Sequence, residues 1–330
     1  MMEDKDMVLL LAVVMIFFAT LFISKQQAVA SASVPTISTS VNVAAKSQIV
    51  DEAAAKAKAK AKAEAEAEAE HQKLLVAKQI KIDEDLRNQL QLAELEKKIK
   101  AFIGDDIDKF GMVYYDINSE ESIEINVDNQ FLAASTVKVP INMLVYDMIQ
   151  DKKIDINEEL KYRKTDFEGG AGILQGTDLT KPIPIKELSD YSIRYSDNIA
   201  INMLLRRVGN KNRYAYIEKI TGHPLVLKGN YTTPMDSFKI LERLYLNPDK
   251  NEYYSGLIEN MKKTEYHDRI DKYIPQEIVA HKIGNYAEYV NDMAIVYDEE
   301  PYMLAVFTKN MPEAAENIAQ VSKMIYEAQQ

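Results

Sequence analysis

The chain has 330 residues, of which 47% are hydrophobic, and a net charge of −11, so it can form a substantial core in one large domain or two ordinary ones. The acidic balance argues against a general nucleic-acid binder, because such a protein needs a surplus of Lys and Arg to neutralise phosphates. The chain has no cysteine and only four histidines, none of them spaced as zinc ligands are, so we expect no metal centre and no cofactor.

A run without charged residues, apolar apart from Thr20, covers residues 7–23, and its 17 residues match the short end of a membrane span. Small residues follow at Ala28-Val29-Ala30, as at a signal-peptide cleavage site. We therefore expect residues 1–30 to be a signal peptide or a membrane anchor, and the rest of the chain to lie outside the cytoplasm, anchored or secreted. The residues before the run, 3–6, are not positive overall, which departs from a good signal peptide; an anchor and a cleaved signal stay as alternatives.

Residues 31–85 are predicted to form a linker and a helical stalk. Residues 24–50 are rich in Ser, Ala, Val and Thr and have no steady period, as in a flexible linker. Residues 53–70 alternate Ala with Lys or Glu, but these are strong helix formers and offer nothing to bury on a sheet face. As a helix, the tract has charges all round, so we interpret it as a solvated spacer.

Residues 86–330 are predicted to form the globular domain. A helical pattern continues to Ile103, and its last part is expected to pack on the domain. Strand-like runs follow at FGMVYYDI and SIEINV, helical patterns fill the middle, and three more strand-like runs precede a final amphipathic helix near residues 312–328. Strands at both ends with helices between them predict an α+β fold, in which the first and last segments complete one antiparallel sheet.

The stretch LAASTVKVPI holds a serine and a lysine three residues apart, Ser135 and Lys138, and no other serine of the chain has a lysine at this spacing. On a helix the two side chains lie about one turn apart on one face. A buried lysine with a lowered pKa can take the proton of the hydroxyl and make it a nucleophile. The alternative is an exposed helix start that Ser135 caps.

Two further motifs follow in the chain, Ser196-Asp197-Asn198 between two helical runs and Lys282-Ile283-Gly284 in a strand-like run. Each motif alone is weak evidence, but SxxK, SDN and K-x-G in this order and context are a strong signal. Over roughly residues 90–330 the sequence resembles the class A β-lactamase and penicillin-binding-protein superfamily of active-site serine enzymes. The segments SDNIAINMLLRRVG, TTP, VAHKIG and LAVFTKN extend the resemblance beyond the three motifs.

The resemblance implies a β-lactamase/transpeptidase-like fold, with an antiparallel sheet flanked by helices and an all-helical subdomain, in a protein of the bacterial cell envelope. It implies an acyl-enzyme formed with β-lactams or with D-alanyl peptides of peptidoglycan. It also implies site residues: the catalytic Ser135, Lys138, Ser196 and Lys282, and the substrate-binding Asn198, Gly284 and Asn285. The backbone N–H groups of Ser135 and Asn285 would form the oxyanion hole.

The sequence departs from the family pattern at two places. Ile283 replaces the usual hydroxyl residue of K-x-G. Between Asn198 and Thr232 the chain is shorter than the family pattern and lacks the loop glutamate that activates water for deacylation. The one acid there, Glu218, is interpreted as part of a surface helix. We therefore expect acylation with slow deacylation; the alternative is a non-catalytic cell-wall or β-lactam-sensing module with the same fold.

Other residues near the motifs have two interpretations each. Arg269 can bind a substrate carboxylate through its planar fork, or it is a plain surface arginine. His281 is interpreted as structural, because neighbours in a strand point to opposite faces and Lys282 takes the cleft side. The glycine-rich residues 169–176 are expected to shape a turn at the cleft rim, with Phe167 or Leu174 lining the pocket.

Overall fold

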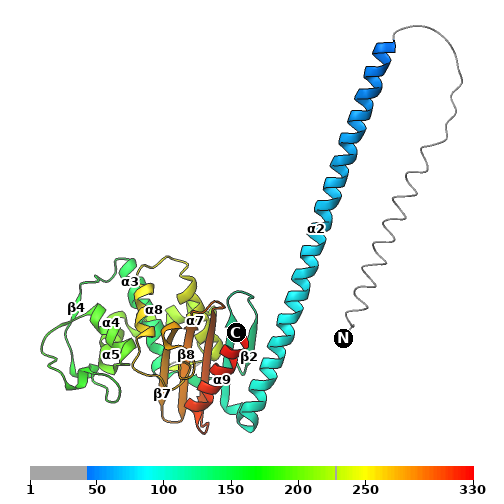
Figure 1. Cartoon of the computed structure of the whole chain (residues 1–330). Coiled ribbons are helices and arrows are strands. Elements are labelled where there is room, and N and C mark those ends of the chain that lie inside the picture. The colour runs from blue at the N-terminus through cyan, green and yellow to red at the C-terminus, as the bar shows by residue number, and fades with distance from the viewer. Residues whose placement is uncertain (1–42, 227–228) are drawn as a thin grey trace. The chain divides into compact units, whose positions relative to one another are not determined.

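The computed structural model describes residues 43–226 and 229–330, apart from the side chains of residues 43–49 and 84–85 (Figure 1). No helix in this part of the chain is both long and apolar enough to cross a membrane. The predicted membrane segment at residues 7–23, the signal peptide or anchor of residues 1–30 and the linker up to residue 42 lie outside the described residues. These expectations stay predictions.

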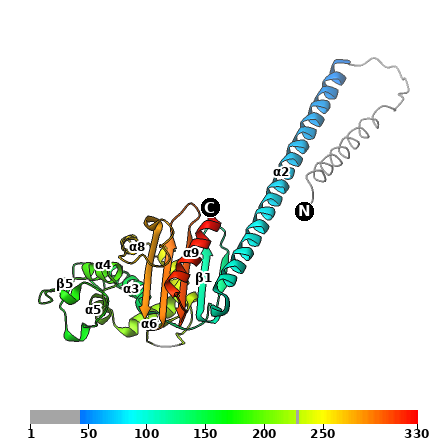
Figure 2. The ribbon, with the colours of Figure 1, turned by 60° about the horizontal axis from the view of Figure 1, so that its bottom comes forward.

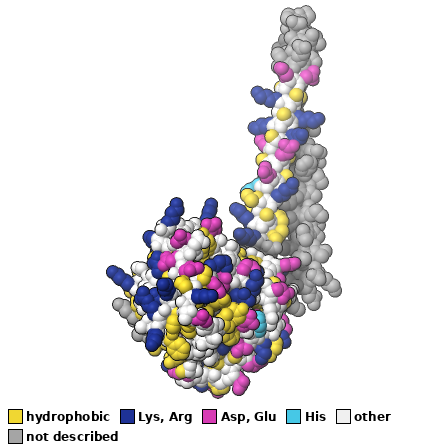
Figure 3. All heavy atoms as spheres, turned by 90° about the vertical axis from the view of Figure 1, so that its left-hand side faces the viewer, with side chains coloured by type: hydrophobic (Ala, Val, Ile, Leu, Met, Phe, Trp, Pro, Cys, Tyr) yellow, Lys and Arg dark blue, Asp and Glu magenta, His cyan; other side chains and the backbone are white. Residues whose placement is uncertain are grey.

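The helix α2 spans Val43–Ile103 and confirms that the Ala/Lys/Glu tract is helical. The expectation of a linker is wrong for residues 43–50, which form the start of this helix, because Ala and Lys there extend a strong helical tract at little cost. Every described side chain from residue 50 to residue 91 is exposed, and charged and hydrophobic side chains share the visible face (Figure 3). Pairs such as Lys60–Glu64, at 3.7 Å, link successive turns. The chain divides into two compact units, residues 1–79 and 80–330, within α2.

The second unit is built on one antiparallel sheet with the strand order β2-β1-β9-β8-β7. The strands are β1 Phe110–Asp116, β2 Ser122–Ile125, β7 Val279–Tyr286, β8 Tyr289–Val296 and β9 Tyr302–Lys309. The first strand pairs with the last, Phe110 opposite Thr308, so the prediction that the two ends of the domain complete one sheet is confirmed.

Both faces of the sheet are covered. Along β9, Met303, Ala305 and Phe307 belong to one hydrophobic cluster, whereas Leu304 and Val306 belong to another, as the alternation of side chains in a strand requires. The second cluster also contains residues of the last turns of α2 and of α9, Ala314–Gln329, which lies along the strands (Figure 2). The expected packing of the end of α2 on the domain and the final helix are thus confirmed.

The first cluster is covered by the predicted helical part of the domain. Its helices are α3 Lys138–Gln150, α4 Ile185–Arg194, α5 Asn198–Val208, α6 Asn210–Thr221, α7 Pro234–Leu246 and α8 Tyr254–Lys262. Two-stranded ribbons join β3 Phe131–Leu132 to β6 Tyr231–Thr232 and β4 Glu159–Leu160 to β5 Ile183–Pro184. Short 3₁₀ helices are η2 Gly104–Lys109, η3 Ala134–Val137, η4 Lys164–Asp166, η5 Leu174–Gly176 and η6 Gln276–Ile278.

Candidate active site

The turn that carries Ser135 is the 3₁₀ helix η3, which leads directly into α3. The turn starts with Ala134 at a positive φ of 50°, a conformation that costs a non-glycine residue about 1 kcal/mol. Neighbouring elements hold it there. The amide of Asn291 on β8 donates to the Leu132 carbonyl at 2.9 Å, and that of Asn230 donates to the Ala134 carbonyl at 3.1 Å. The position of Ser135 is therefore fixed by tertiary contacts.

Lys138 joins the first two motifs. Its Nζ lies 3.0 Å from Ser135 Oγ, 3.2 Å from Ser196 Oγ and 2.7 Å from Asn198 Oδ1, and it also donates to the Ser196 carbonyl. Ser135 does not cap α3, because the residue before the helix is Val137, with no side-chain cap. The alternative of an exposed, capped helix start is thus wrong, and the one-turn spacing of serine and lysine creates the contact.

The SDN motif connects α4 to α5, with Ser196 at a φ of 51° and Asn198 as the first residue of α5. Asp197 anchors this segment in two directions: one carboxylate oxygen accepts from the Ala200 N–H at 2.9 Å and caps α5, and the other accepts from the N–H groups of Ile173 and Leu174 at 2.7 and 2.8 Å. Gly172 is needed beside it, because a Cβ there would lie 2.3 Å from Asp197 Oδ2. The glycine-rich segment thus packs against the SDN motif.

The K-x-G motif lies on the edge strand β7 and packs against η3. The side chain of Lys282 is fully buried, and its Nζ donates to Ser196 Oγ at 3.0 Å. A Cβ on Gly284 would lie 2.5 Å from the Ala133 carbonyl oxygen, so only glycine lets the strand approach the turn this closely. Ser196 Oγ therefore lies between the two lysine amines, and the three motifs meet at one place.

Burial controls the charge of both lysines. Burial lowers the pKa of Lys138 from 10.5 to about 8, against the charges of Asp197 and Glu168, which raise it. Burial and the nearby charge of Lys138 also hold the pKa of Lys282 well below its usual value. Burial penalises the charged form of both amines, and the charge of Lys138 opposes a charge on Lys282, so an amine of this pair is neutral more readily than a free lysine and can accept a proton.

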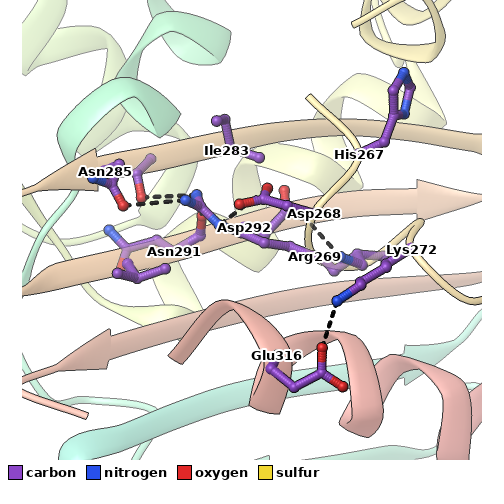
Figure 4. A network of polar contacts seen from close by, with 12 residues as sticks. His267, Asp268, Arg269, Lys272, Ile283, Asn285, Asn291, Asp292 and Glu316 are labelled. Atoms are coloured by element: carbon purple, nitrogen blue, oxygen red, sulfur yellow. Dashed lines mark hydrogen bonds and ion pairs between the residues drawn. The ribbon is translucent and has the colours of Figure 1, made fainter. Parts of the chain in front are cut away.

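Arg269 is only 4% exposed, so the alternative of a plain surface arginine is wrong. Its guanidinium reaches β7 and β8, where it donates to the Gly284 carbonyl at 3.2 Å, the Asn291 carbonyl at 2.9 Å and Asn285 Oδ1 at 3.1 Å (Figure 4). It does not line the pocket described next. In this structure Arg269 supports the strand end that carries Asn285.

A pocket of about 450 Å³ opens in front of Ser135. Of the predicted site residues, Ser135, Lys138, Asn198 and Asn285 line it, whereas Ser196, Lys282 and Gly284 lie behind this lining. The guess that Phe167 or Leu174 lines the pocket is wrong: Phe167 is 58% exposed and Leu174 is buried beside Asp197. Glu168, which follows Phe167 in the sequence, lines the pocket instead.

Sequence reasoning missed several residues that line the pocket, namely Glu168, Asn202, Arg213, Asn230 and Tyr286. One signal was available for Asn202, which lies one helical turn after Asn198 on the same face of α5. Its amide donates to Glu168 Oε2 at 2.9 Å and so fixes a carboxylate at the pocket. Glu218 lies on α6 and accepts from the Leu225 N–H at 3.2 Å, outside the pocket, as predicted.

His281 is buried on the side of β7 opposite to Lys282, where its Nδ1 lies 3.0 Å from Asp292 Oδ2 on the neighbouring strand. It makes no contact with the serine and lysine cluster in the described residues. The prediction that His281 is structural and not a base of the cleft is consistent with this position.

Comparison with known proteins places these features in a family. The model of the β-lactamase enzyme family matches residues 94–329. β-Lactamase BRO-1 of Moraxella catarrhalis is 26% identical over 74% of this chain and 88% of its own length, and β-lactamase SME-1 of Serratia marcescens is 24% identical over 70% and 88%. The structure of PBP-A is similar in fold, with a TM-score of 0.67 and 24% identity over 72% of this chain and 96% of PBP-A. The chain therefore belongs to the β-lactamase enzyme family, within the superfamily of active-site serine hydrolases.

Proposed function

We propose that the chain is a serine hydrolase that forms an acyl-enzyme at Ser135 with β-lactams or with D-alanyl peptides of the cell wall. The observation that carries the proposal is the Ser135 hydroxyl 3.0 Å from Lys138 Nζ, an amine whose pKa burial lowers to about 8. This arrangement supplies a base for the hydroxyl at neutral pH. A relative of similar fold, a variant of PBP-A, has been solved as an acyl-enzyme with penicillin G.

In the proposed acylation, Ser135 Oγ attacks the carbonyl carbon of the substrate while its proton moves to neutral Lys138 Nζ. The carbonyl oxygen becomes an oxyanion, which the backbone N–H groups of Ser135 and Asn285 stabilise. The C–N bond then breaks, and the leaving nitrogen takes a proton relayed through Ser196 Oγ, which contacts both lysines. Asn198, which lines the pocket, binds the side-chain amide of the substrate, and Lys282 acts from behind the lining through its hydrogen bond to Ser196 Oγ.

Deacylation is proposed to be slow. Residues 199–231 offer no glutamate to the pocket, because Glu218, the one acid among them, lies outside the pocket. Glu168 does line the pocket, but Asn202 binds its carboxylate. Glu168 also precedes the SDN motif in the sequence, whereas the loop glutamate of the family follows it. We assign the protein to the outside of the cytoplasmic membrane, anchored or secreted, since its substrates lie there.

The test is a timed reaction of the full chain with a fluorescent penicillin, followed by intact mass. We expect an adduct on Ser135 that persists for hours, and no adduct with Ser135→Ala. Labelling that persists in Ser135→Ala means that the nucleophile is misassigned, and no adduct with the natural sequence favours a non-catalytic module. An adduct that decays within seconds in the natural chain but persists in Glu168→Gln contradicts slow deacylation and assigns water activation to Glu168.

A further inference from the structure

A second cluster of titratable side chains lies on the side of β7 away from the catalytic lysines. His267 and Asp271 come from the segment between α8 and η6, and His281 comes from β7. One ligand atom from each of these three side chains lies within 4.8 Å of the others. We propose that His267, Asp271 and His281 form a binding site for one Zn²⁺ ion.

The buried part of the cluster contains a carboxylate oxygen that makes no hydrogen bond and a ring nitrogen that is held only by an ion pair. The side chains of Asp271 and His281 are each 1% exposed, and Nε2 of His281 lies 3.3 Å from Asp271 Oδ2. Neither His281 Nε2 nor Asp271 Oδ1 makes a hydrogen bond within the described residues. Buried polar atoms without partners are rare and destabilising, so each one needs an explanation. A cation coordinated by both side chains satisfies them together.

The geometry suits a tetrahedral ion. Two ligands bound to Zn²⁺ at about 2.0–2.1 Å lie about 3.3 Å apart in a tetrahedral site, which is the separation of His281 Nε2 and Asp271 Oδ2. The other ring nitrogen of His281, Nδ1, contacts both carboxylate oxygens of Asp292, at 3.1 and 3.0 Å. A metal-bound histidine usually donates its second N–H to a carboxylate, which fixes the ring and leaves the ligand nitrogen unprotonated.

His267, the third ligand, is partly exposed, so an ion can reach the site from the solvent. The His267 side chain is 37% exposed, and its Nδ1 hydrogen-bonds Asp271 in this structure. On binding, that nitrogen loses its proton and becomes a ligand, and a water molecule completes the coordination from the solvent side. The ligands are imidazole and carboxylate without thiolate, a set that suits Zn²⁺ and its spectroscopic substitute Co²⁺.

Charge also favours a divalent ion. Asp271 and Asp292 bring two buried carboxylates to the one buried imidazole of His281. Without metal, a proton on His281 between the two carboxylates balances part of this charge. Zn²⁺ must displace that proton, and in return it neutralises both acids. The alternative to the metal site is therefore a permanently protonated histidine, and the experiment separates the two.

The site would connect the segment before η6 to the strand that carries Lys282. Arg269 lies between two of the ligands in the sequence and bonds Asn285 (Figure 4). The Tyr266 ring, next to His267, lies 5.8 Å from Lys282 Nζ. The ion would thus hold in place a segment that contacts the back of the catalytic cluster, and no chemical step depends on it.

The experiment is a titration of the chelator-treated full chain with Co²⁺, followed by visible absorption and by competition with Zn²⁺. We expect one Co²⁺ per chain, the strong absorption of a tetrahedral site, and full displacement by Zn²⁺. His267→Ala removes the ligand that reaches the solvent, together with its contact to Asp271, and should weaken binding by more than about 100-fold, since even outer-shell partners contribute about 10- to 100-fold. His223→Ala is the matched control, because His223 pairs with Asp236 outside the cluster.

The melting temperature with and without Zn²⁺ is the second measurement, and it shows whether a variant that does not bind is still folded. Zn²⁺ should raise the melting temperature of the natural chain and of His223→Ala, and leave that of His267→Ala unchanged. The proposal is wrong if Co²⁺ does not saturate the chain, or if His267→Ala binds as the natural chain does. In that case the cluster is the protonated histidine held by two carboxylates. Neither measurement depends on penicillin labelling, so the proposed function can fail separately.

Discussion

Acylation of Ser135 should follow the ionisation of Lys138, because only the neutral amine can take the hydroxyl proton. With a pKa of about 8, roughly 9% of Lys138 is neutral at pH 7 and roughly 90% at pH 9, so the rate constant should rise about tenfold. An unburied lysine with a pKa of 10.5 would be only about 0.03% neutral at pH 7. The lowered pKa of Lys138 thus raises the fraction of neutral amine at pH 7 about 300-fold.

Glu168→Gln should shift the dependence of the acylation rate constant on pH toward lower pH. The negative charge of Glu168 raises the pKa of Lys138, so its removal lowers that pKa and increases the neutral fraction at any pH on the rising limb. The rising limb should therefore move to lower pH, and acylation at pH 7 should become faster. The new side-chain amide keeps an oxygen that can accept from Asn202, so the pocket should retain its shape.

The assay is the second-order acylation rate constant of the full chain with a chromogenic β-lactam, measured by stopped flow from about pH 6 to pH 10. Glu218→Gln is the control, because this glutamate bonds the Leu225 N–H outside the pocket and should leave the profile unchanged. An acylation rate constant that does not change with pH, or that rises only near the pKa of a free lysine, would refute the role of Lys138. A shift to higher pH in Glu168→Gln would refute the electrostatic reasoning.

Three further changes test other parts of the structure. Gly284→Ala places a Cβ 2.5 Å from the Ala133 carbonyl oxygen, so it should lower the melting temperature and slow acylation at least tenfold. Gly256→Ala is the control, because this glycine is exposed on α8 and its Cβ would meet nothing within 4 Å. This control should raise the free energy of unfolding by about 1 kcal/mol in a denaturant titration. Arg269→Lys keeps the charge but loses the planar fork, so steady-state kinetics should show weaker substrate binding with little loss of fold, and unchanged kinetics would exclude a supporting role. Deletion of residues 31–85 should leave acylation in solution unchanged, and lost activity would contradict the interpretation of this stretch as a spacer.

The contact of Ser135 with Lys138 was predictable because their spacing in the sequence is local. Ser135 and Lys138 meet within one helical turn, and short motifs mark the other two segments, so the sequence alone predicted which residues would meet. Glu168 and Arg213 were not predictable, because they reach the pocket only through the packing of a loop and of α6 around it. The same holds for Arg269. An arginine near the K-x-G motif suggested a site for a substrate carboxylate, but the side chain is buried and donates to the Gly284 carbonyl of β7.

The start of α2 was mispredicted for a simpler reason. Composition alone does not mark where a helix begins, and residues 43–50 contain enough Ala and Lys to continue the strong tract after them. By contrast, the sheet was predicted well, since its strands alternate side chains between two buried faces and each run is bounded by turn residues.

The attachment of α2 to the domain has a mechanical consequence. Its last turns, through Leu95, Ile99 and Ile103, share a hydrophobic cluster with α9 and with one face of the sheet, whereas the pocket belongs to the opposite side. In the strand order, β9 and β8 separate β1, which follows α2, from the edge strand that carries Lys282. A pull on the N-terminal part of the chain would therefore load α9 and the strands next to β1 first. The edge strand β7, which carries Lys282 and packs against the turn of Ser135, would bear such a load last.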